Sequence, residues 1–313
     1  MINIPTKAEQ IVRNISNVLL GKEKAVRLAM IALVCGGHVL IEDAPGLGKT
    51  TLVISLAKSL GCSFGRIQFT PDLLPSDITG FTIYDINTGQ KTLCPGGLIH
   101  QLVLADEINR TSPKTQSALL EAMQEHQVTV DGQTIDLPRP FMVMATQNPL
   151  ELAGTYPLPE AQMDRFFMRI RLGYPSLKEE IDILSHHQNG NVETDIAPVL
   201  NAGEVLELQQ AVYSTAVSDA VKQYISRIAE ATRQHKEIEL PMSPRGSIAL
   251  MHAAMGCALL QGRAYTLPDD VQKVAEPVLA HRLGLYPAYR AKKRIGEMVL
   301  QEIIAALPVP AAS

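Results

Sequence analysis

The stretch that decides the fold is Val39-Leu40-Ile41-Glu42-Asp43-Ala44-Pro45-Gly46-Leu47-Gly48-Lys49-Thr50. It begins with a short apolar run of the kind that forms a buried strand. Turn-forming residues follow at 45–48. Residues 51–60 then have a helical composition that ends at Gly61, and glycine is typical of the position after a helix. A strand, a tight turn and a helix in this order indicate an α/β fold with a parallel sheet.

Further apolar segments in the first half of the chain have the length and composition of strands. They are residues 66–69, 102–105, 141–145 and 167–172. Helical patterns separate several of these segments, as in chains that alternate strands and helices. Together with the first strand, they predict a five-stranded parallel sheet covered by helices on both faces.

Two insertions interrupt this alternation. Residues 127–137 surround Asp131-Gly132, a dipeptide that, between alternating apolar residues, is a strong short-range signal for a β-hairpin. The helix before this hairpin is expected to begin with Ser112 as its N-cap and Pro113 as its first residue. The second insertion, residues 70–97, is rich in Pro, Gly and Asp and contains a candidate strand at 81–85.

The composition changes at Gly173-Tyr174-Pro175. Ser176 and Glu179 then have the spacing of a capping box, which opens a helix. Beyond this point the strand signals fade and helical periodicity dominates. We therefore divide the chain into an α/β domain over residues 1–173, a linker helix over 174–189 and a smaller all-α domain over 190–313.

The charge balance argues against several classes of protein. Lys and Arg total 28 against 32 Asp and Glu, giving a formal net charge of −4, whereas a mainly electrostatic nucleic-acid binder is usually basic. The longest apolar run, residues 28–41, is broken at Gly36-Gly37-His38 and falls short of the about 20 residues that a membrane span needs. The first residues lack the basic and apolar regions of a signal peptide. We expect a cytoplasmic protein with no membrane segment and no nucleic-acid partner.

Residues 45–51 have the pattern of a phosphate-binding loop. Glycines let backbone N–H groups converge on phosphate oxygens, and the positive end of the following helix favours an anion. Lys49 would contact the β- and γ-phosphates, and the Thr50 hydroxyl would bind Mg²⁺. The general pattern has glycine where this chain has Asp43, so that carboxylate must point away from the phosphates. The predicted nucleotide-binding residues are Pro45, Gly46, Leu47, Gly48, Lys49, Thr50 and Thr51. A chance Gly-Lys-Thr at a helix start is the alternative.

A second group of candidates is acidic. The apolar segment 102–105 ends in Asp106 and Glu107. Asp106 is suited to hold Mg²⁺ through water, and Glu107 is suited to accept a proton from an attacking water as a general base. The alternative is an acidic pair that caps the next helix. The phosphate-binding loop upstream favours the catalytic interpretation.

Three further polar residues complete the candidate set. Asn148 follows the strand at 141–145 and can orient water against a γ-phosphate, although an Asn-Pro turn is the alternative. Arg165 precedes the strand at 167–172, where a surface salt bridge is the alternative. Arg245 opens a nearly apolar helix, where a cation opposes the helix dipole and requires an anion. That anion is either a phosphate in the cleft between the domains or a local carboxylate such as Glu239.

The order of these motifs resembles that of the MoxR family of AAA+ ATPases over about residues 5–305. The matching segments are residues 37–50, Ala105-Asp106-Glu107-Ile108-Asn109-Arg110, Ala145-Thr146-Gln147-Asn148-Pro149, residues 154–166 and Ser243-Pro244-Arg245. The resemblance implies a P-loop AAA+ core with a helical lid. It also implies that the protein binds and hydrolyses ATP with Mg²⁺.

The same resemblance implies roles for single residues. Asn148 would be the sensor 1 residue, Arg165 the arginine finger of a neighbouring subunit's site, and Arg245 the sensor 2 arginine of the lid. The hairpin at 127–137 would be the pre-sensor 1 insertion and residues 70–97 the helix 2 insertion. Members of the family are thought to form hexameric rings. They act as chaperone-like motors on protein partners, often proteins with von Willebrand A domains.

Other functions stay open at this point. A motor subunit of a metal-chelatase-like complex would share the architecture. A nucleotide-gated scaffold would bind ATP with little turnover. A DNA-translocating ring belongs to the same broad superfamily, but the acidic balance and the absence of Trp disfavour it.

Overall fold

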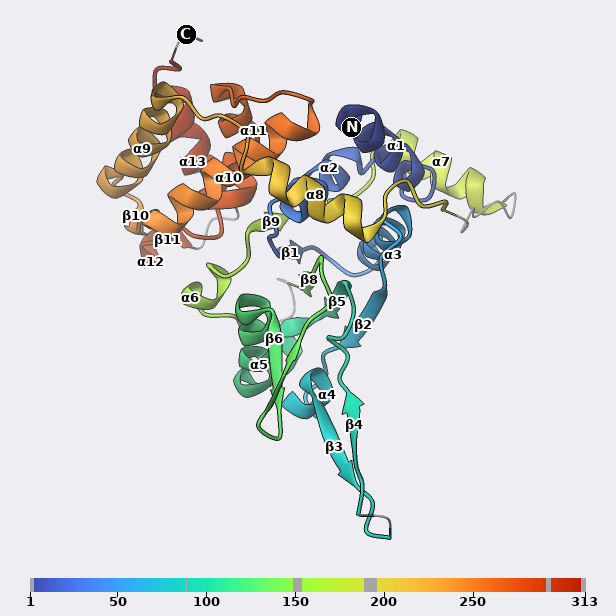
Figure 1. Cartoon of the computed structure of the whole chain (residues 1–313). Helices are drawn as coiled ribbons and strands as arrows, with labels where there is room; N and C mark the ends of the chain where they lie inside the picture. The colour runs from blue at the N-terminus through green and yellow to red at the C-terminus, as the bar shows by residue number, and fades with distance from the viewer. Residues whose placement is uncertain (1–2, 88, 149–153, 189–195, 291–293, 311–313) are drawn as a thin grey trace.

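The computed structural model describes residues 3–87, 89–148, 154–188, 196–290 and 294–310. At its centre lies a parallel sheet of five strands in the order β2-β5-β8-β1-β9 (Figure 1). The strands are β1 (Val39–Glu42), β2 (Phe64–Gln68), β5 (Leu102–Asp106), β8 (Met142–Gln147) and β9 (Met168–Ile170). Each of the five strands that the sequence predicts for the parallel sheet overlaps one of these, so the predicted α/β class is confirmed.

Both faces of the sheet are buried. Successive residues of a strand point to opposite sides, so each strand contributes side chains to both faces. Val39 and Ile41 pack into one hydrophobic cluster, whereas Leu40 packs into the other. The first cluster contains residues of α1 (Ile4–Ser16), α2 (Glu23–Val34), α3 (Lys49–Ser59) and the C-terminal helices. The second contains residues of α5 (Pro113–Glu125). Burial on both sides explains why the strands are continuous apolar runs in the sequence.

The helix starts differ in how their first N–H groups are used. In α5 the Ser112 hydroxyl accepts from the backbone N–H of Thr115 at 3.4 Å, as the sequence predicted. In α1 the Asn3 side chain accepts from Thr6 N–H at 3.3 Å. By contrast, α3 follows Gly48, and no side chain in the described part of the chain caps it. The first turn of α3 therefore keeps N–H groups for another acceptor.

Both predicted insertions contain hairpins. In the first, β6 (Gln127–Val130) and β7 (Gln133–Asp136) pair through Asp131 and Gly132, whose φ angles of 49° and 81° have the sign that a type I′ turn needs. The second comprises α4 (Pro75–Thr79), β3 (Gly80–Tyr84) and β4 (Lys91–Pro95). The β3–β4 hairpin extends away from the rest of the chain (Figure 1). The sequence indicated only its first strand.

The C-terminal part is mostly helical. Its first helix, α7 (Leu177–Gln188), begins with the predicted capping box: Ser176 N–H donates to Glu179 Oε2 at 2.6 Å, and Glu179 N–H donates to Ser176 Oγ at 3.3 Å. The other helices are α8 (Ala202–Val212), α9 (Asp219–Gln234), α10 (Pro244–Leu260), α11 (Pro268–Leu279), α12 (Pro287–Arg290) and α13 (Ile295–Ala306). The sequence did not predict the short antiparallel pair β10 (Ile238–Leu240) and β11 (Gly284–Leu285), so this region is not purely helical. Within the described ranges, no helix is long and apolar enough to cross a membrane.

Four charged side chains join the sheet to the last helix. Arg169 and Arg171 each contact both Glu42, at the end of β1, and Glu297 of α13, with N–O distances between 2.5 and 3.3 Å. The Glu42 and Glu297 side chains are 11% and 6% exposed. Charges buried to this degree are tolerated only when they are paired. This network therefore fixes α13 against the strand that leads into residues 45–50.

His38 is buried immediately before β1. Its Nε2 donates to the carbonyl of Met123 at 2.9 Å, and its Nδ1 accepts from Val143 N–H at 3.0 Å. An imidazole that both donates and accepts is neutral. Burial lowers the pKa of His38 to about 4 from an ordinary value of 6.5.

The His38 site predicts loss of stability in acid. Because the folded pKa lies below that of the unfolded chain, protonation favours unfolding. The contribution of His38 is complete above pH 6.5 and is lost as the pH falls toward 4. From pH 7 to pH 5 the free energy of unfolding should fall by about 2 kcal/mol more in the wild type than in His38→Gln. Glutamine can also donate and accept but does not titrate. Denaturant titrations at both pH values measure the difference, and equal losses would contradict the prediction.

Candidate active site

Residues 45–48 lie between the carboxyl end of β1 and the start of α3, whose first residues are Lys49 and Thr50. Gly46 and Gly48 have φ angles of 82° and 87°, a region that residues with a Cβ rarely adopt. A Cβ on Gly48 would also collide with Cδ1 of Leu19, which lies in the connection between α1 and α2. The backbone therefore requires both glycines, and the α1–α2 connection lies directly against the loop.

Lys49 and Asp43 are linked through the backbone of this loop. Lys49 Nζ donates to the carbonyl oxygen of Asp43 at 2.8 Å. The Asp43 carboxylate accepts from the backbone N–H groups of Leu172 and Gly173, just beyond β9. The carboxylate is thus occupied by the backbone at the end of β9, which agrees with the expectation that it does not face a phosphate. The acid at the non-glycine position holds the end of β9 instead.

The acidic pair lies at the same edge of the sheet. Thr146 Oγ1 of β8 donates to Asp106 Oδ1 at 2.6 Å and accepts from Glu107 N–H at 2.8 Å. Arg66 Nη2 of β2 donates to Asp106 Oδ2 at 2.8 Å. Glu107 has a φ of 60°, which is unusual for a non-glycine residue and is held here by the bond to Thr146. Neighbouring strands therefore fix both acids.

The Glu107 carboxylate is also held in place. Gln68 Nε2 donates to Glu107 Oε2 at 2.9 Å, and Arg110 Nε lies 3.2 Å from the same oxygen. Although Glu107 precedes the short helix η1 (Ile108–Arg110), its side chain makes no capping hydrogen bond to that helix among the described residues. The contacts of the Glu107 carboxylate are therefore with Gln68 and Arg110, which differs from the alternative in which the acids cap the next helix.

The charges of the loop and of the acids face one another. Burial lowers the pKa of Lys49, and the carboxylates of Asp106, Asp43 and Glu107 oppose that effect. Asn148 directly follows Gln147, the last residue of β8, so it lies at this carboxyl edge as well. The structure therefore brings the predicted loop, the acidic pair and Asn148 together.

The predicted arginines lie at the opposite edge. Arg165 is in the turn between α6 (Glu160–Met163) and β9, and Arg245 is at the start of α10. Both line a cavity of about 330 Å³ together with residues 36–38, which precede β1. Since all strands are parallel, this amino edge faces away from Lys49.

The surroundings of Arg245 correct one expectation. Its Nη1 lies 3.5 Å from Asp164 Oδ2, beside Arg165 in the chain. It lines the cavity at the amino edge of the sheet, and the carboxylate that it contacts there is that of Asp164. The expectation that Arg245 faces a phosphate between the two parts of its own chain is therefore wrong.

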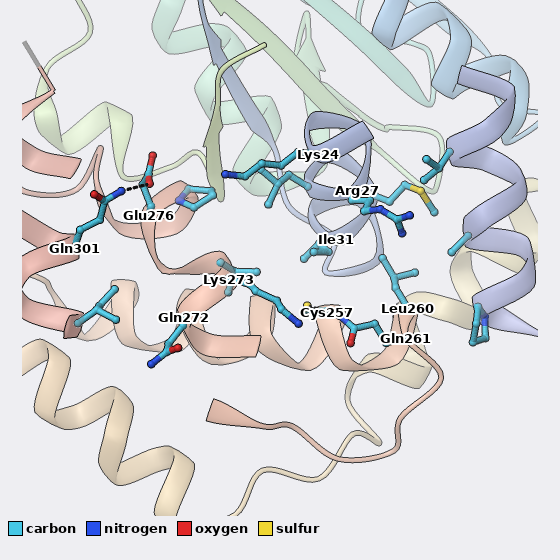
Figure 2. Close-up of a pocket in the computed structure, with 18 of the residues that line it drawn as sticks. Lys24, Arg27, Ile31, Cys257, Leu260, Gln261, Gln272, Lys273, Glu276 and Gln301 are labelled. Atoms are coloured by element: carbon cyan, nitrogen blue, oxygen red, sulfur yellow. Dashed lines mark hydrogen bonds between the residues drawn. The ribbon is translucent and has the colours of Figure 1, made fainter. Parts of the chain in front are cut away.

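A larger cavity lies between helices of the core and the C-terminal helices. It has a volume of about 1020 Å³, and residues of α1, α2, α10, α11 and α13 line it. Figure 2 shows Lys24, Lys273 and Glu276 around it, with Ile31 and Leu260 among the apolar residues. In the described chain its lining does not include residues 45–50. This cavity is large enough for a ligand, but it is not the site built around Lys49.

Sequence analysis did not single out Arg66, Thr146 or Gln68, the last of which contacts Glu107. Arg66 and Thr146 both contact Asp106, from the strands on either side of β5. Thr146 belongs to the segment that ends in Asn148, so its place at a strand end was a usable signal. Arg66 gave no such signal, because only the pairing of β2 with β5 brings it to Asp106.

The chain is similar in sequence and in structure to known proteins. Residues 38–168 match the family described as "ATPase family associated with various cellular activities (AAA)", and residues 230–303 match "AAA lid domain". YeaC of Bacillus subtilis is 51% identical over 299 residues, covering 96% of this chain and 93% of that protein. Chaperone MoxR1 of Mycobacterium tuberculosis is 39% identical over 311 residues, covering 96% of this chain and 82% of that protein. A crystal structure from Cytophaga hutchinsonii, named "putative ATPase", matches with a TM-score of 0.90 and 36% identity, covering 98% of this chain and 96% of that one.

The Thr146 hydroxyl should contribute to stability as well as to geometry. Thr146→Val keeps the shape but leaves the buried Asp106 and the Glu107 N–H without this partner. We expect the free energy of unfolding to fall by about 1–3 kcal/mol. Thr129→Val, on the exposed face of β6, should change it by less than about 0.5 kcal/mol. Denaturant titration of both variants makes the comparison, and equal effects would show that the Thr146 contacts are unimportant.

Proposed function

This chain belongs to the MoxR family of AAA+ ATPases, and we propose that it hydrolyses ATP with Mg²⁺ in a site that a second copy of the chain completes. One observation carries the proposal. Lys49, Asp106 and Glu107 lie at the carboxyl edge of a parallel sheet, whereas Arg165 and Arg245 lie at its amino edge. Within one chain these groups cannot surround the same phosphate.

The phosphate loop and Lys49 would bind the nucleotide. The uncapped first turn of α3 offers N–H groups and the positive end of its dipole to an anion. Lys49 Nζ, which now donates to its own loop at Asp43, would donate to phosphate oxygens instead. Leu19 lies against Gly48, and we place the adenine beside this connection.

Thr50 and Asp106 would hold Mg²⁺. The donor set fits a hard cation, because both residues offer oxygen, and Asp106 can bind through water while it keeps its bonds to Thr146 and Arg66. When bound, the ion neutralises charge on the β- and γ-phosphate oxygens. Arg66 and Thr146 keep the Asp106 carboxylate in one orientation.

Glu107 is placed to act as the general base. Its carboxylate would accept a proton from a water molecule whose oxygen attacks the γ-phosphorus, and ADP would leave with the bridging oxygen. Gln68 and Arg110 hold this carboxylate, and Thr146 holds its backbone. Asn148, at the end of the adjacent strand β8, would orient the same water.

The arginines at the amino edge would serve the site of a neighbour. Arg165 and Arg245 share one cavity, so both would face the γ-phosphate that the adjacent copy binds. Charge supplied in this way stabilises the transition state and can raise the rate by about 10³–10⁵. Each copy then gives and receives arginines, as the copies of a closed ring do. We take the ring to be a hexamer, as the family resemblance implies.

The β3–β4 hairpin supports a protein client. Phe81, Ile83, Tyr84 and Ile86 are 46–88% exposed on a hairpin that extends from the body. Exposed apolar side chains grouped in this way are typical of surfaces that bind other proteins. We propose that ATP hydrolysis remodels or activates a protein client there. A protein with a von Willebrand A domain is the client that the family resemblance implies.

The assigned roles of Lys49 and Glu107 predict different defects. Glu107→Gln should retain ATP binding while kcat falls by about 10²–10⁴, because the base is lost and the phosphate contacts remain. Lys49→Ala should abolish binding. Lys58→Ala, at the exposed end of the same helix, is the matched control and should change neither value. Calorimetry and phosphate release measure the two effects, and unchanged phosphate release in Glu107→Gln would remove the role of that residue.

A site shared between copies predicts complementation. Lys49→Ala cannot bind ATP but keeps its arginine, whereas Arg165→Ala binds ATP but lacks the arginine. Each variant alone should be inactive, and a mixture of the two should hydrolyse ATP. The wild-type rate per subunit should also rise with protein concentration. Phosphate release from titrated mixtures makes the measurement. An inactive mixture of correctly folded variants would contradict the shared site.

A further inference from the structure

Arg282, just beyond the end of α11, is a buried cation that sequence analysis did not single out. Its side chain is 4% exposed. Nε donates to Asp164 Oδ1 at 2.8 Å, and Nη2 donates to the carbonyls of Phe166 at 2.8 Å and Asp164 at 3.4 Å. Nη1 donates to the carbonyls of Phe167 at 3.1 Å and of Val278. Every N–H of the guanidinium therefore has an acceptor.

Most of these acceptors belong to one turn. Residues 164–167 connect α6 to β9 and include Arg165. Three of their carbonyls accept from Arg282, and His281 Nε2 makes a further contact of 3.0 Å with the Phe166 carbonyl. A turn at the protein surface usually directs its carbonyls to water. Here Arg282 and His281, rather than water, contact these carbonyls, so buried side chains fix the backbone that carries Arg165.

Asp164 extends this arrangement to Arg245. Its Oδ1 accepts from the buried Arg282, and its Oδ2 lies 3.5 Å from Nη1 of Arg245, whose side chain is 60% exposed. One carboxylate thus links an inner arginine to an outer one. Arg165 follows Asp164 directly in the chain, so the same unit determines where Arg165 and Arg245 lie.

The chemistry of the side chain supports a geometric role. An arginine presents its donors in a rigid planar fork, whereas a lysine has three donors on a flexible stem and could not satisfy this set of acceptors. Burying a cation costs several kcal/mol unless its partners are complete. Attachment of the C-terminal helices does not require this cation, because Arg169, Arg171 and Glu297 already join α13 to the sheet.

We propose that Arg282 is a positioning residue that holds the 164–167 turn and, through Asp164, sets Arg165 and Arg245 toward the site of the neighbouring copy. The proposal rests on the function proposed above. In this proposal Arg282 makes the C-terminal helices and the 164–167 turn one unit, so a displacement of α11 relative to the sheet displaces both Arg165 and Arg245. Displacement of a catalytic group by about 1 Å can lower a rate by about 10².

The test places the variant in the copy that supplies the arginine. Lys49→Ala/Arg282→Gln is mixed with Arg165→Ala, and its recovered ATP hydrolysis is compared with that of Lys49→Ala mixed with Arg165→Ala. We expect the recovered kcat to fall at least about tenfold, with KM for ATP within about twofold, because the ATP lies in the Arg165→Ala copy, whose phosphate loop and acids are unaltered. Light scattering with ATP checks that the mixed assembly keeps its size.

A control removes a comparable ion pair at the other end of the same helix. Arg263 is 19% exposed and donates to both carboxylate oxygens of Asp270, near the start of α11, at 2.7 and 2.6 Å. Lys49→Ala/Arg263→Gln should complement as well as Lys49→Ala does. If it fails to the same degree as the Arg282 variant, general loosening of the helices explains both results and the positioning role is overturned.

A second variant guards against loss of folding. Arg282→Lys keeps a cation but not the fork, so it should fold, as thermal unfolding would show, and still complement several-fold less well than arginine. Full complementation by both Arg282 variants would overturn the positioning role and leave the proposed ATPase intact. Absence of ATP hydrolysis by the wild type would instead overturn the proposed function, and the positioning role with it.

Discussion

The parallel alignment of the five strands is the constraint on which the rest of the structure depends. In a parallel sheet every strand ends at the same edge, so groups that follow strands converge there and groups that precede strands converge at the other edge. Lys49 and Asn148 follow strands and Asp106 ends one, whereas Arg165 and His38 precede them. A side chain at one edge is too short to reach along the strands to the other edge. The chain therefore separates the groups that we propose bind a phosphate from the cations that would complete its surroundings, and it does so through topology rather than through any local interaction.

The carboxyl edge is held by contacts that reach beyond the loop itself. The Asp43 carboxylate accepts from the backbone beyond β9, and Glu42, one residue earlier, shares Arg169 and Arg171 with Glu297 of α13. Because an unpaired charge at these depths is costly, the pairs must form together. The phosphate loop is thus anchored to the neighbouring strand and to the last helix. A loop anchored in this way is preorganised for a ligand, and little ordering entropy is lost when the ligand binds.

The parts that could be predicted from sequence are those with local causes. Val39–Ile41 are apolar because both faces of β1 are covered, Asp131-Gly132 supplies the positive φ angles of a hairpin, and Ser112 caps the helix that begins at the next residue. The parts that were missed depend on long-range pairing. Arg66 reaches Asp106 only through the β2–β5 register, and Arg282 contacts a turn 118 residues earlier in the chain. Arg245 shows the same limit: its helix-start position indicated correctly that it needs an anion, but only the fold shows that the anion is Asp164.

The two arginines differ in which part of the chain carries them, and this has a consequence for any assembly. Arg165 belongs to the sheet domain, whereas Arg245 belongs to α10, and Asp164 with Arg282 joins them. A phosphate bound in the loop of one copy would contact both arginines of the adjacent copy. It would thereby fix the position of the helical part of that adjacent copy relative to its sheet. Loss of that phosphate would remove its contacts with Arg165 and Arg245, whereas the buried contacts of Arg282 would remain. The internal geometry of each copy would then respond to its neighbour's nucleotide, which is the requirement for passing a change around a ring.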